Sequence, residues 1–277
     1  MALFLVLVIA IGWGFSYYYA DPIILYFVII FAVFMNVFSY WFSDKIVLSL
    51  HKAKPVTRAE HFDLWNMTEN LAITAGLPMP KLYIIEDSAP NAFATGRDKD
   101  HAVVAVTTGL LNILDKSELE GVIAHELAHI GNKDMLLSTI VVVMVGFIAL
   151  LSDFFLRAQL MSGGGRDRDS KAGGVILIIG LILAILAPIA ASLIQLAVSR
   201  KREFLADASG ALLTRYPQGL ASALKKISAV PTPMKTANNA TAHLFISNPF
   251  SSKKRSGLHK LFMTPPPTED RVRALLG

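Results

Sequence analysis

The sequence predicts a predominantly α-helical integral membrane protein with a small β-sheet and about four transmembrane helices. Three observations support this fold class. Of the 277 residues, 53% are hydrophobic and only 17% are charged, whereas soluble domains carry about 25% charged residues. The mean hydropathy is +0.50. The apolar residues are also concentrated in four blocks, which is the pattern of membrane spans.

Charge and cysteine content narrow the possible partners. The net charge of +5 comes from Lys and Arg clusters beside the apolar blocks, and such clusters meet anionic lipid headgroups. A lipid bilayer is therefore the expected partner, and nucleic acid is not. The chain has no cysteine, which excludes disulfides, thiolate metal sites and cysteine nucleophiles.

The first two apolar blocks predict a tight helical hairpin, from Ala2 to Tyr19 and from Ile23 to Phe42. Each is about 18–20 residues long, enough to cross ~30 Å of hydrocarbon at ~1.5 Å per residue. Trp and Tyr lie mostly toward their ends, where aromatic belts occur. The first block lacks a basic leading segment and a small-residue cleavage site, so we interpret it as a retained span.

The third block runs from Met135 to Leu156 and the fourth from Gly174 to Val198. Ser162 to Ser170 between them is a polar, glycine-rich loop. Because polar residues dilute the third block, an alternative is a hairpin that lies partly within protein.

Basic residues predict the orientation of the chain. They follow the second and fourth blocks, whereas the first connection carries only Asp21. The positive-inside rule therefore places both termini and the segments 43–134 and 199–277 in the cytoplasm. Independently of orientation, residues 125–129 and 199–207 flank the same hairpin and emerge on one face of the membrane.

The segments outside the apolar blocks predict a mixed fold. Hydrophobic periodicity predicts a helix over 58–75 that ends at Gly76. Three strands are expected at Lys81 to Glu86, Asn91 to Gly96 and Ala102 to Thr107. Further helices are expected near 200–214, near 217–228 and from Thr268 to Leu276.

The motif His125-Glu126-Leu127-Ala128-His129 predicts a catalytic zinc site with one ion per chain. Histidines four apart lie about 40° apart around a helix, so both imidazoles project toward one ion. A chain of this length and composition would contain roughly 0.005 such motifs by chance. We interpret Ser117 to Glu120 as a capping box and Gly131 as the helix end, which supports the helical context. Glu126 is the expected general base, taking a proton from water and handing it to the leaving amine.

Catalytic zinc needs a third protein ligand. Glu203 and Asp207 lie four apart on one expected helix, on the membrane face shared with the histidines. An alternative is that Glu203 only pairs with a neighbouring arginine. The candidates for the third ligand are Glu203, Asp207, Asp134, His243 and His259.

With these motifs the chain resembles the HtpX family of membrane zinc endopeptidases, which are relatives of the CAAX prenyl protease. The resemblance rests on the paired N-terminal blocks, Asn91 to Gly96, Thr107 to Leu111, His125 to His129 and Glu203 to Asp207.

The resemblance implies a zincin-like (gluzincin) metalloprotease domain in the cytoplasmic (inner) membrane of a bacterium or archaeon. Glu203 would be the third zinc ligand, and Asp207 would orient a zinc-bound histidine. Arg271 matches the family's arginine and would help to stabilise the transition state. Pro265 stands where the family has histidine, so that polar group cannot be carried over. The implied function is the proteolysis of misfolded membrane proteins, in quality control and stress response.

The expected hairpin 91–107 precedes the metal helix. An exposed edge strand there would hold an extended polypeptide by main-chain hydrogen bonds, with Asn91, Ala92, Phe93 and Ala94 as the substrate-binding residues. The alternative is a wholly structural hairpin.

These assignments divide the chain into four parts. They are 1–43, an N-terminal two-span hairpin; 44–134, the first part of the catalytic domain with the edge strand and the zinc helix; 135–198, a second transmembrane hairpin; and 199–277, the second part of the catalytic domain with the third zinc ligand.

The sequence argues against two other functions and leaves two alternatives open. Charged residues around the motif argue against a site-2-type intramembrane protease, and the scarcity of ionisable groups within the spans argues against a transporter. A prenyl-protein (CAAX-type) protease remains an alternative. A weakly active or inactive pseudoprotease also remains one, because of Pro265.

Overall fold

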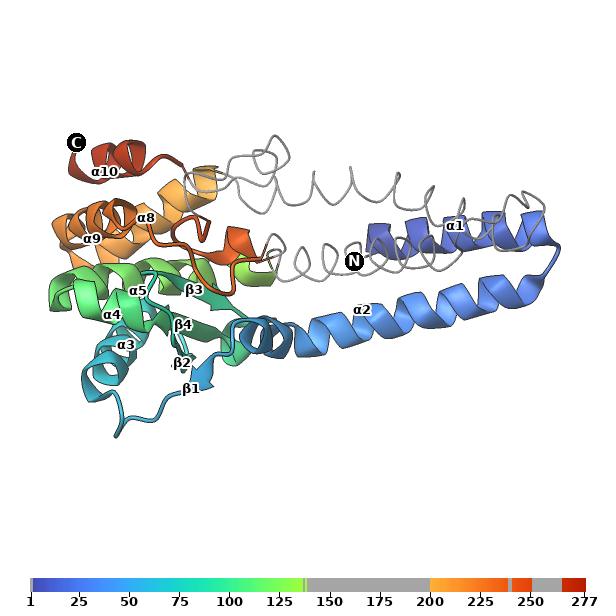
Figure 1. Cartoon of the computed structure of the whole chain (residues 1–277), viewed down its shortest axis with the longest axis horizontal. Helices are drawn as coiled ribbons and strands as arrows, with labels where there is room; N and C mark the ends of the chain where they lie inside the picture. Colours follow the sequence, from blue (N-terminus) through green and yellow to red (C-terminus); the bar gives the residue numbers. More distant parts are fainter. Residues whose placement is uncertain (1, 137, 139–199, 239–240, 251–265) are drawn as a thin grey trace, which may run out of the picture. The chain divides into compact units, whose positions relative to one another are not determined.

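The computed structural model describes residues 2–136, 138, 200–238, 241–250 and 266–277 (Figure 1). Two compact units divide the chain, and residues 2–43 are the described part of the first. The third and fourth apolar blocks lie outside the described residues, apart from the start of the third. His259 and Pro265 also lie outside them.

The first unit contains helix α1 (Ala2–Tyr19) and most of helix α2 (Pro22–Leu50). Ala20 turns the chain at a φ of 52°, and the Asp21 carboxylate accepts a hydrogen bond from the Ile23 amide at 2.9 Å. Helices that match the first two apolar blocks are therefore present. Within the described parts of the chain, no helix combines the length and hydropathy of a membrane span.

The second unit contains a mixed four-stranded sheet in the order β1-β2-β4-β3, so the predicted small sheet is confirmed. Strand β1 (Lys54–Pro55) is antiparallel to β2 (Lys81–Ile85), and β2 is parallel to β4 (Val103–Thr107). Strand β3 (Ala92–Thr95) is antiparallel to β4 and forms the sheet edge. Strand β1 and a 3-10 turn, η1 (Lys99–His101), were not predicted.

Helices surround the sheet, most of them close to their expected positions. They are α3 (Phe62–Ala75), α4 (Thr108–Ile113), α5 (Lys116–Gly131), α8 (Arg200–Thr214), α9 (Pro217–Ala229), the 3-10 turn η2 (Ala242–Leu244) and α10 (Thr268–Leu276). Of these, α4 and η2 were not predicted. Helix α5 is central, since it packs against α3, α8, α9 and β3 (Figure 1). Its apolar side chains Val122, Ile123 and Leu127 are completely buried.

Both ends of α5 differ from the prediction. The N-cap is Asp115, whose side chain accepts from the Glu118 amide at 3.0 Å while Glu118 accepts from the Asp115 amide at 2.9 Å. The capping box predicted at Ser117 is therefore wrong by two residues, because Asp115 is also a strong capping residue. Gly131 is the last helical residue, but the left-handed residue beyond it is Lys133, at a φ of 61°.

Two glycines bring α8 and α9 against α5. A Cβ atom on Gly121 would lie 2.6 Å from the Leu220 amide nitrogen of α9. A Cβ atom on Gly210 of α8 would lie 2.9 Å from the His125 amide nitrogen. Helix α9 therefore packs directly against Gly121 of α5, and α8 lies directly on the backbone of the motif.

Candidate metal centre

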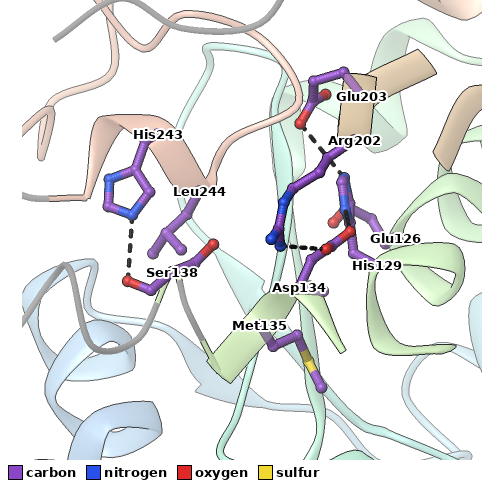
Figure 2. Close-up of a pocket in the computed structure, with 10 residues that line it drawn as sticks. Glu126, His129, Asp134, Met135, Ser138, Arg202, Glu203, His243 and Leu244 are labelled. Carbon is purple, nitrogen blue, oxygen red and sulfur yellow. Dashed lines mark hydrogen bonds and ion pairs between the residues drawn. The ribbon is translucent and has the colours of Figure 1, made fainter. Parts of the chain in front are cut away.

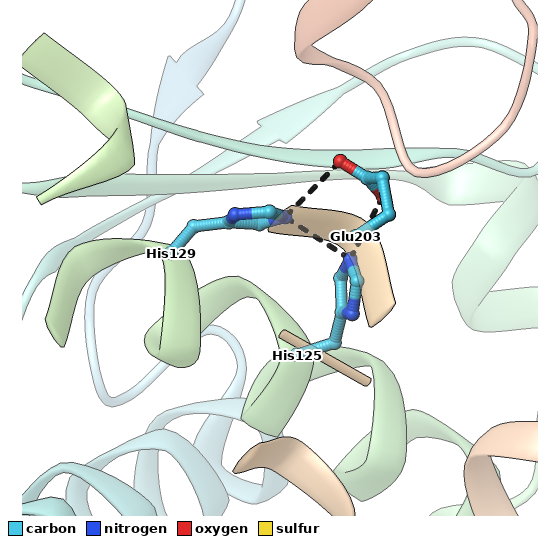
Figure 3. A group of neighbouring side chains, drawn as sticks. All are labelled: His125, His129 and Glu203. Atoms are coloured by element: carbon cyan, nitrogen blue, oxygen red, sulfur yellow. Dashed lines mark hydrogen bonds and ion pairs between the residues drawn. The ribbon is translucent and has the colours of Figure 1, made fainter. Parts of the chain in front are cut away.

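Three of the predicted metal ligands converge at one point (Figure 3). The Nε2 atoms of His125 and His129 lie 3.2 Å apart. Each lies 3.7 Å from a different carboxylate oxygen of Glu203. Helix α5 supplies both imidazoles from successive turns, and α8 supplies the carboxylate. All three ligand atoms lie within 4.8 Å of one another.

Asp207 and Arg271 lie behind His125. The Nδ1–H of His125 donates to Asp207 at 2.9 Å. Arg271 grips the same carboxylate twice, through Nε at 2.8 Å and Nη2 at 2.6 Å, and donates to the Ile246 carbonyl at 3.1 Å. Burial opposes ionisation of Asp207, but the hydrogen bonds from Arg271 and His125 prevail and lower its pKa. Burial lowers the pKa of His125, which favours the neutral imidazole that a metal requires.

Asp134 and Arg202 lie behind His129 (Figure 2). The Nδ1 atom of His129 is 3.1 Å from Asp134 Oδ2, and Arg202 Nη1 is 2.6 Å from Asp134 Oδ1. Burial alone would lower the pKa of His129, but the carboxylates of Asp134, Glu203 and Glu126 outweigh it and raise that pKa to about 9. The surroundings of His129 therefore favour a positive charge.

The donor set fits a zinc ion. Each histidine directs Nδ1 at a carboxylate, so the two Nε2 atoms present lone pairs to each other at 3.2 Å. Two such acceptors can share a proton or a cation, but they cannot satisfy each other as neutral groups. Two imidazoles and one carboxylate are ligands that zinc accepts, and three protein ligands leave one position open.

Glu126 lies beside this centre in a small polar pocket (Figure 2). This residue is 1% exposed, and neither carboxylate oxygen has a hydrogen-bond partner among the described residues. Burial raises the pKa of Glu126 to about 7. The pocket is lined by Ala94, Glu126, His129, Asp134, Met135, Ser138, Arg202, Glu203, His243 and Leu244.

The other candidates for the third ligand lie around this centre in different ways. Asp207 and Asp134 contact histidine Nδ1 atoms, on the side of each ring away from the other histidine. His243 lies in the pocket wall, where its Nε2 atom is 3.3 Å from the Ser138 carbonyl oxygen. Burial lowers the pKa of His243 to about 4. Among the described candidates, only Glu203 completes the group with both histidines.

The four predicted substrate-binding residues have different surroundings. Asn91 is buried and donates to the Ser247 carbonyl at 2.9 Å, and the Ala92 carbonyl accepts from the Ile246 amide at 3.0 Å. Phe93 is fully buried. Ala94 lines the pocket. Residues 246–247 therefore cover the start of the β3 edge and leave Ala94 beside Glu126.

Arg271 lies beside this centre, and its role in stabilising the transition state stays a prediction. Its side chain is 2% exposed, and its donors bind Asp207 and the Ile246 carbonyl. Its Nη2 atom also lies 3.4 Å from His125 Nε2, and its Nη1 atom lies 3.8 Å from Glu203. Sequence reasoning did not identify the arginine–carboxylate pair at Asp207, nor the one at Asp134. A signal existed for the first, because Arg271 and Asp207 both match family motifs.

Comparison with known proteins shows which proteins this chain is similar to. The model of peptidase family M48 matches residues 59–277. A Protease HtpX homolog from Caldanaerobacter subterraneus subsp. tengcongensis is 46% identical over 99% of this chain and 92% of its own length. A Protease HtpX homolog from Tropheryma whipplei is 52% identical over 85% of this chain and 79% of its own. The crystal structure of S. mikatae Ste24p has a similar fold, with a TM-score of 0.57 at 19% identity, over 97% of this chain and 62% of that one.

Proposed function

The chain belongs to peptidase family M48 and is a metallopeptidase, and we propose that it is a zinc-dependent endopeptidase of the cytoplasmic membrane. Its proposed substrates are membrane-associated, misfolded polypeptides, as part of protein quality control under stress. The observation that carries the proposal is the group of His125, His129 and Glu203 beside the unpaired carboxylate of Glu126. The name of the HtpX homologues supports the protease assignment.

The proposed zinc ligands are the Nε2 atoms of His125 and His129 and the carboxylate of Glu203. When bound, zinc supplies Lewis acidity, which polarises a carbonyl group and makes water more acidic near neutral pH. The carboxylates on the two Nδ1 atoms fix both imidazoles in the tautomer that directs a lone pair at the ion.

Glu126 is the proposed general base. With a pKa raised to about 7 by burial, its carboxylate accepts a proton near neutral pH and can also release it. As the water oxygen bonds to the scissile carbonyl carbon, one water proton passes to Glu126. The same proton then passes to the amide nitrogen, the C–N bond breaks, and a carboxylic acid and an amine are released. The acid then loses the second water proton to the amine or to solvent.

Ala94 is the proposed main-chain contact for the substrate. The Thr107 amide donates to the Asn91 carbonyl within the β3–β4 ladder, whereas the Ala92 carbonyl accepts from Ile246 on the opposite side. Since main-chain groups alternate in direction along an antiparallel strand, those of Ala94 also face away from β4. An extended polypeptide could pair there by adding a strand to the sheet.

The proposed location is the cytoplasmic membrane, with four spans and the catalytic domain in the cytoplasm. Large apolar side chains on α1 and α2 support this location, since Trp13, Tyr17, Ile23 and Phe27 are each more than 60% exposed. Such exposed apolar surface requires a lipid or protein partner. The clusters of Lys and Arg after the second and fourth blocks support the orientation.

The test of this function uses the full chain purified in detergent. One zinc per chain is expected, with cleavage of casein that a chelator stops and added zinc restores. Casein is chosen because main-chain recognition makes little demand on sequence. A chain without stoichiometric metal, or cleavage that persists in chelator, would contradict the proposal.

A further inference from the structure

We propose that Asp134 is a positioning residue for His129 and that Arg202 acts through it. This inference rests on the proposed zinc-dependent function and adds two residues to it. Asp134 is 8% exposed, its Oδ2 atom lies 3.1 Å from His129 Nδ1, and its Oδ1 atom lies 2.6 Å from Arg202 Nη1. Figure 2 shows the three side chains as one chain of contacts at the wall of the pocket.

The backbone makes this contact possible at a break in the helix. In a continuous α-helix, a residue five positions after His129 would lie about 140° away around the axis and could not contact it. Helix α5 ends at Gly131, and Lys133 then takes a left-handed conformation at a φ of 61°. A non-glycine residue in that region costs on the order of 1 kcal/mol, and such residues cluster at functional sites. The turn at Lys133 directs Asp134 back to the imidazole.

The contact repeats an arrangement found at the other histidine. At His125, Asp207 accepts from Nδ1 and Arg271 grips that carboxylate through two nitrogens. At His129, Asp134 faces Nδ1 and a single Arg202 nitrogen binds the carboxylate. The Nδ1 atom of each histidine thus contacts a carboxylate that is paired with an arginine. A carboxylate on Nδ1 fixes the orientation of the ring and makes Nε2 a better ligand.

The two arginines are held to different degrees. Arg271 is 2% exposed in its side chain, whereas the Arg202 side chain is 36% exposed. Water therefore competes with Arg202 for Asp134, and the loss of Arg202 should matter less than the loss of Asp134.

Arg202 also gives α8 a double connection to His129. Arg202 and Glu203 are adjacent on α8, and they address opposite sides of the same imidazole. Glu203 faces Nε2 at 3.7 Å, and Arg202 reaches Nδ1 through Asp134. The end of α5 and the start of α8 are therefore joined through the ring that binds the ion.

The test measures zinc affinity by competition with a chelator, in the full chain purified in detergent. Asp134→Ala should weaken zinc binding about 10–100-fold, as the loss of a carboxylate behind a metal-bound histidine does. Arg202→Ala should weaken it by a smaller factor. If Arg202 acts through Asp134, the double variant should bind zinc as Asp134→Ala does, because the two losses are not independent.

Lys226→Ala is the matched control. It removes the basic partner of Glu118, a carboxylate that is also mostly buried, and the ion pair has the same length of 2.6 Å at the other end of α5. Zinc affinity should be unchanged in this variant. Asp134→Asn, which retains an oxygen acceptor for Nδ1–H, should fall between the parent and Asp134→Ala and guards against failure of the alanine variant to fold.

The outcomes separate this inference from the proposed function. A parent chain that fails to bind one zinc defeats the proposed function. If the parent binds zinc but Asp134→Ala and Asp134→Asn match its affinity, the positioning role is overturned, whatever the change in thermal stability. Additive losses in the double variant would overturn the claim that Arg202 acts through Asp134.

Discussion

At the scale of single residues, the carboxylates of this centre differ in what holds them. Asp207 and Asp134 each have an arginine, whereas Glu126 has no hydrogen-bond partner among the described residues. The arginines hold the two aspartates in place beside the histidines, whereas burial raises the pKa of Glu126 to about 7, so that it can exchange a proton near neutral pH. The division predicts which substitutions affect catalysis and which affect the metal.

Glu126→Gln should abolish peptide cleavage and leave zinc bound. The amide cannot accept the proton of the attacking water, whereas the ligand atoms of His125, His129 and Glu203 are untouched. Casein cleavage and zinc content of the same preparation provide the measurement. A loss of zinc in step with the loss of cleavage would contradict the role of general base.

Glu203→Ala should lower zinc occupancy severely, because it removes one of three ligands. Asp207→Ala should weaken zinc affinity only about 10–100-fold, since the His125 ligand atom remains. Titration of both variants with a zinc chelator ranks the two effects. Equal zinc content in Glu203→Ala and the parent would show that another side chain is the third ligand.

Individual residues also show how far sequence can predict the site. The spacing of His125 and His129 predicts a shared face because it depends only on helical geometry. The contact between Asp134 and His129 depends on the left-handed turn at Lys133, and lysine gives no local signal for that conformation. The helical spacing of residues therefore predicts contacts within a helix, but it cannot predict contacts across a helix break.

At the scale of elements, the site depends on the close approach of α8 to α5. Gly210 lies where a side chain would reach the backbone of the motif, and Gly121 has the same relation to α9. The sequence predicted these helices and most of their boundaries. It did not predict which faces meet, because a small residue in a helix has many explanations.

Gly210→Ala should destabilise the chain and weaken zinc binding. The new Cβ atom would lie 2.9 Å from the His125 amide nitrogen, so α8 must move away and take Glu203 with it. Overpacking of this kind costs typically about 1–3 kcal/mol. Thermal unfolding and zinc titration provide the measurements.

Gly131→Ala is the control for that substitution. Its Cβ atom would lie 3.9 Å from Leu77, an ordinary contact, and alanine favours a helix more than glycine does. Stability should be equal or slightly higher, with zinc affinity unchanged. Equal behaviour of Gly210→Ala and Gly131→Ala would show that the close approach of α8 does not govern the site.

At the scale of the whole molecule, buried histidines connect stability to pH. His51, after the predicted second span, is 1% exposed, and its two ring nitrogens lie 2.9 Å from the hydroxyls of Thr236 and Thr241. Burial lowers the pKa of His51 to about 4. In the unfolded chain, His51 has an ordinary histidine pKa of about 6.5. Between about pH 4 and 6.5, the unfolded chain therefore binds a proton that the folded chain does not bind.

Stability should fall as the pH decreases from about 6.5 to about 4. The contribution of neutral His51 is fully present above the unfolded pKa and is lost as the pH falls toward the folded one. One such group changes the free energy of unfolding by at most about 1.4 kcal/mol per pH unit. Unfolding measured across this range should give a flatter profile in His51→Gln than in the parent. Parallel profiles would contradict the prediction.

The orientation of the chain can be tested by cysteine labelling, because the sequence contains no cysteine to interfere. Asp100 and Lys235 are exposed in the second unit, and Ala20 is exposed in the turn between α1 and α2. The positive-inside rule places the first two in the cytoplasm and Ala20 on the other side, because Lys and Arg follow the second and fourth blocks while the first turn carries only Asp21.

In intact cells, a membrane-impermeant thiol reagent should therefore label Ala20→Cys and spare Asp100→Cys and Lys235→Cys. After the cells are opened, all three should be labelled, which shows that the spared thiols are reactive. Labelling of Asp100→Cys or Lys235→Cys in intact cells would place the metal centre outside the cytoplasm and overturn the proposed location.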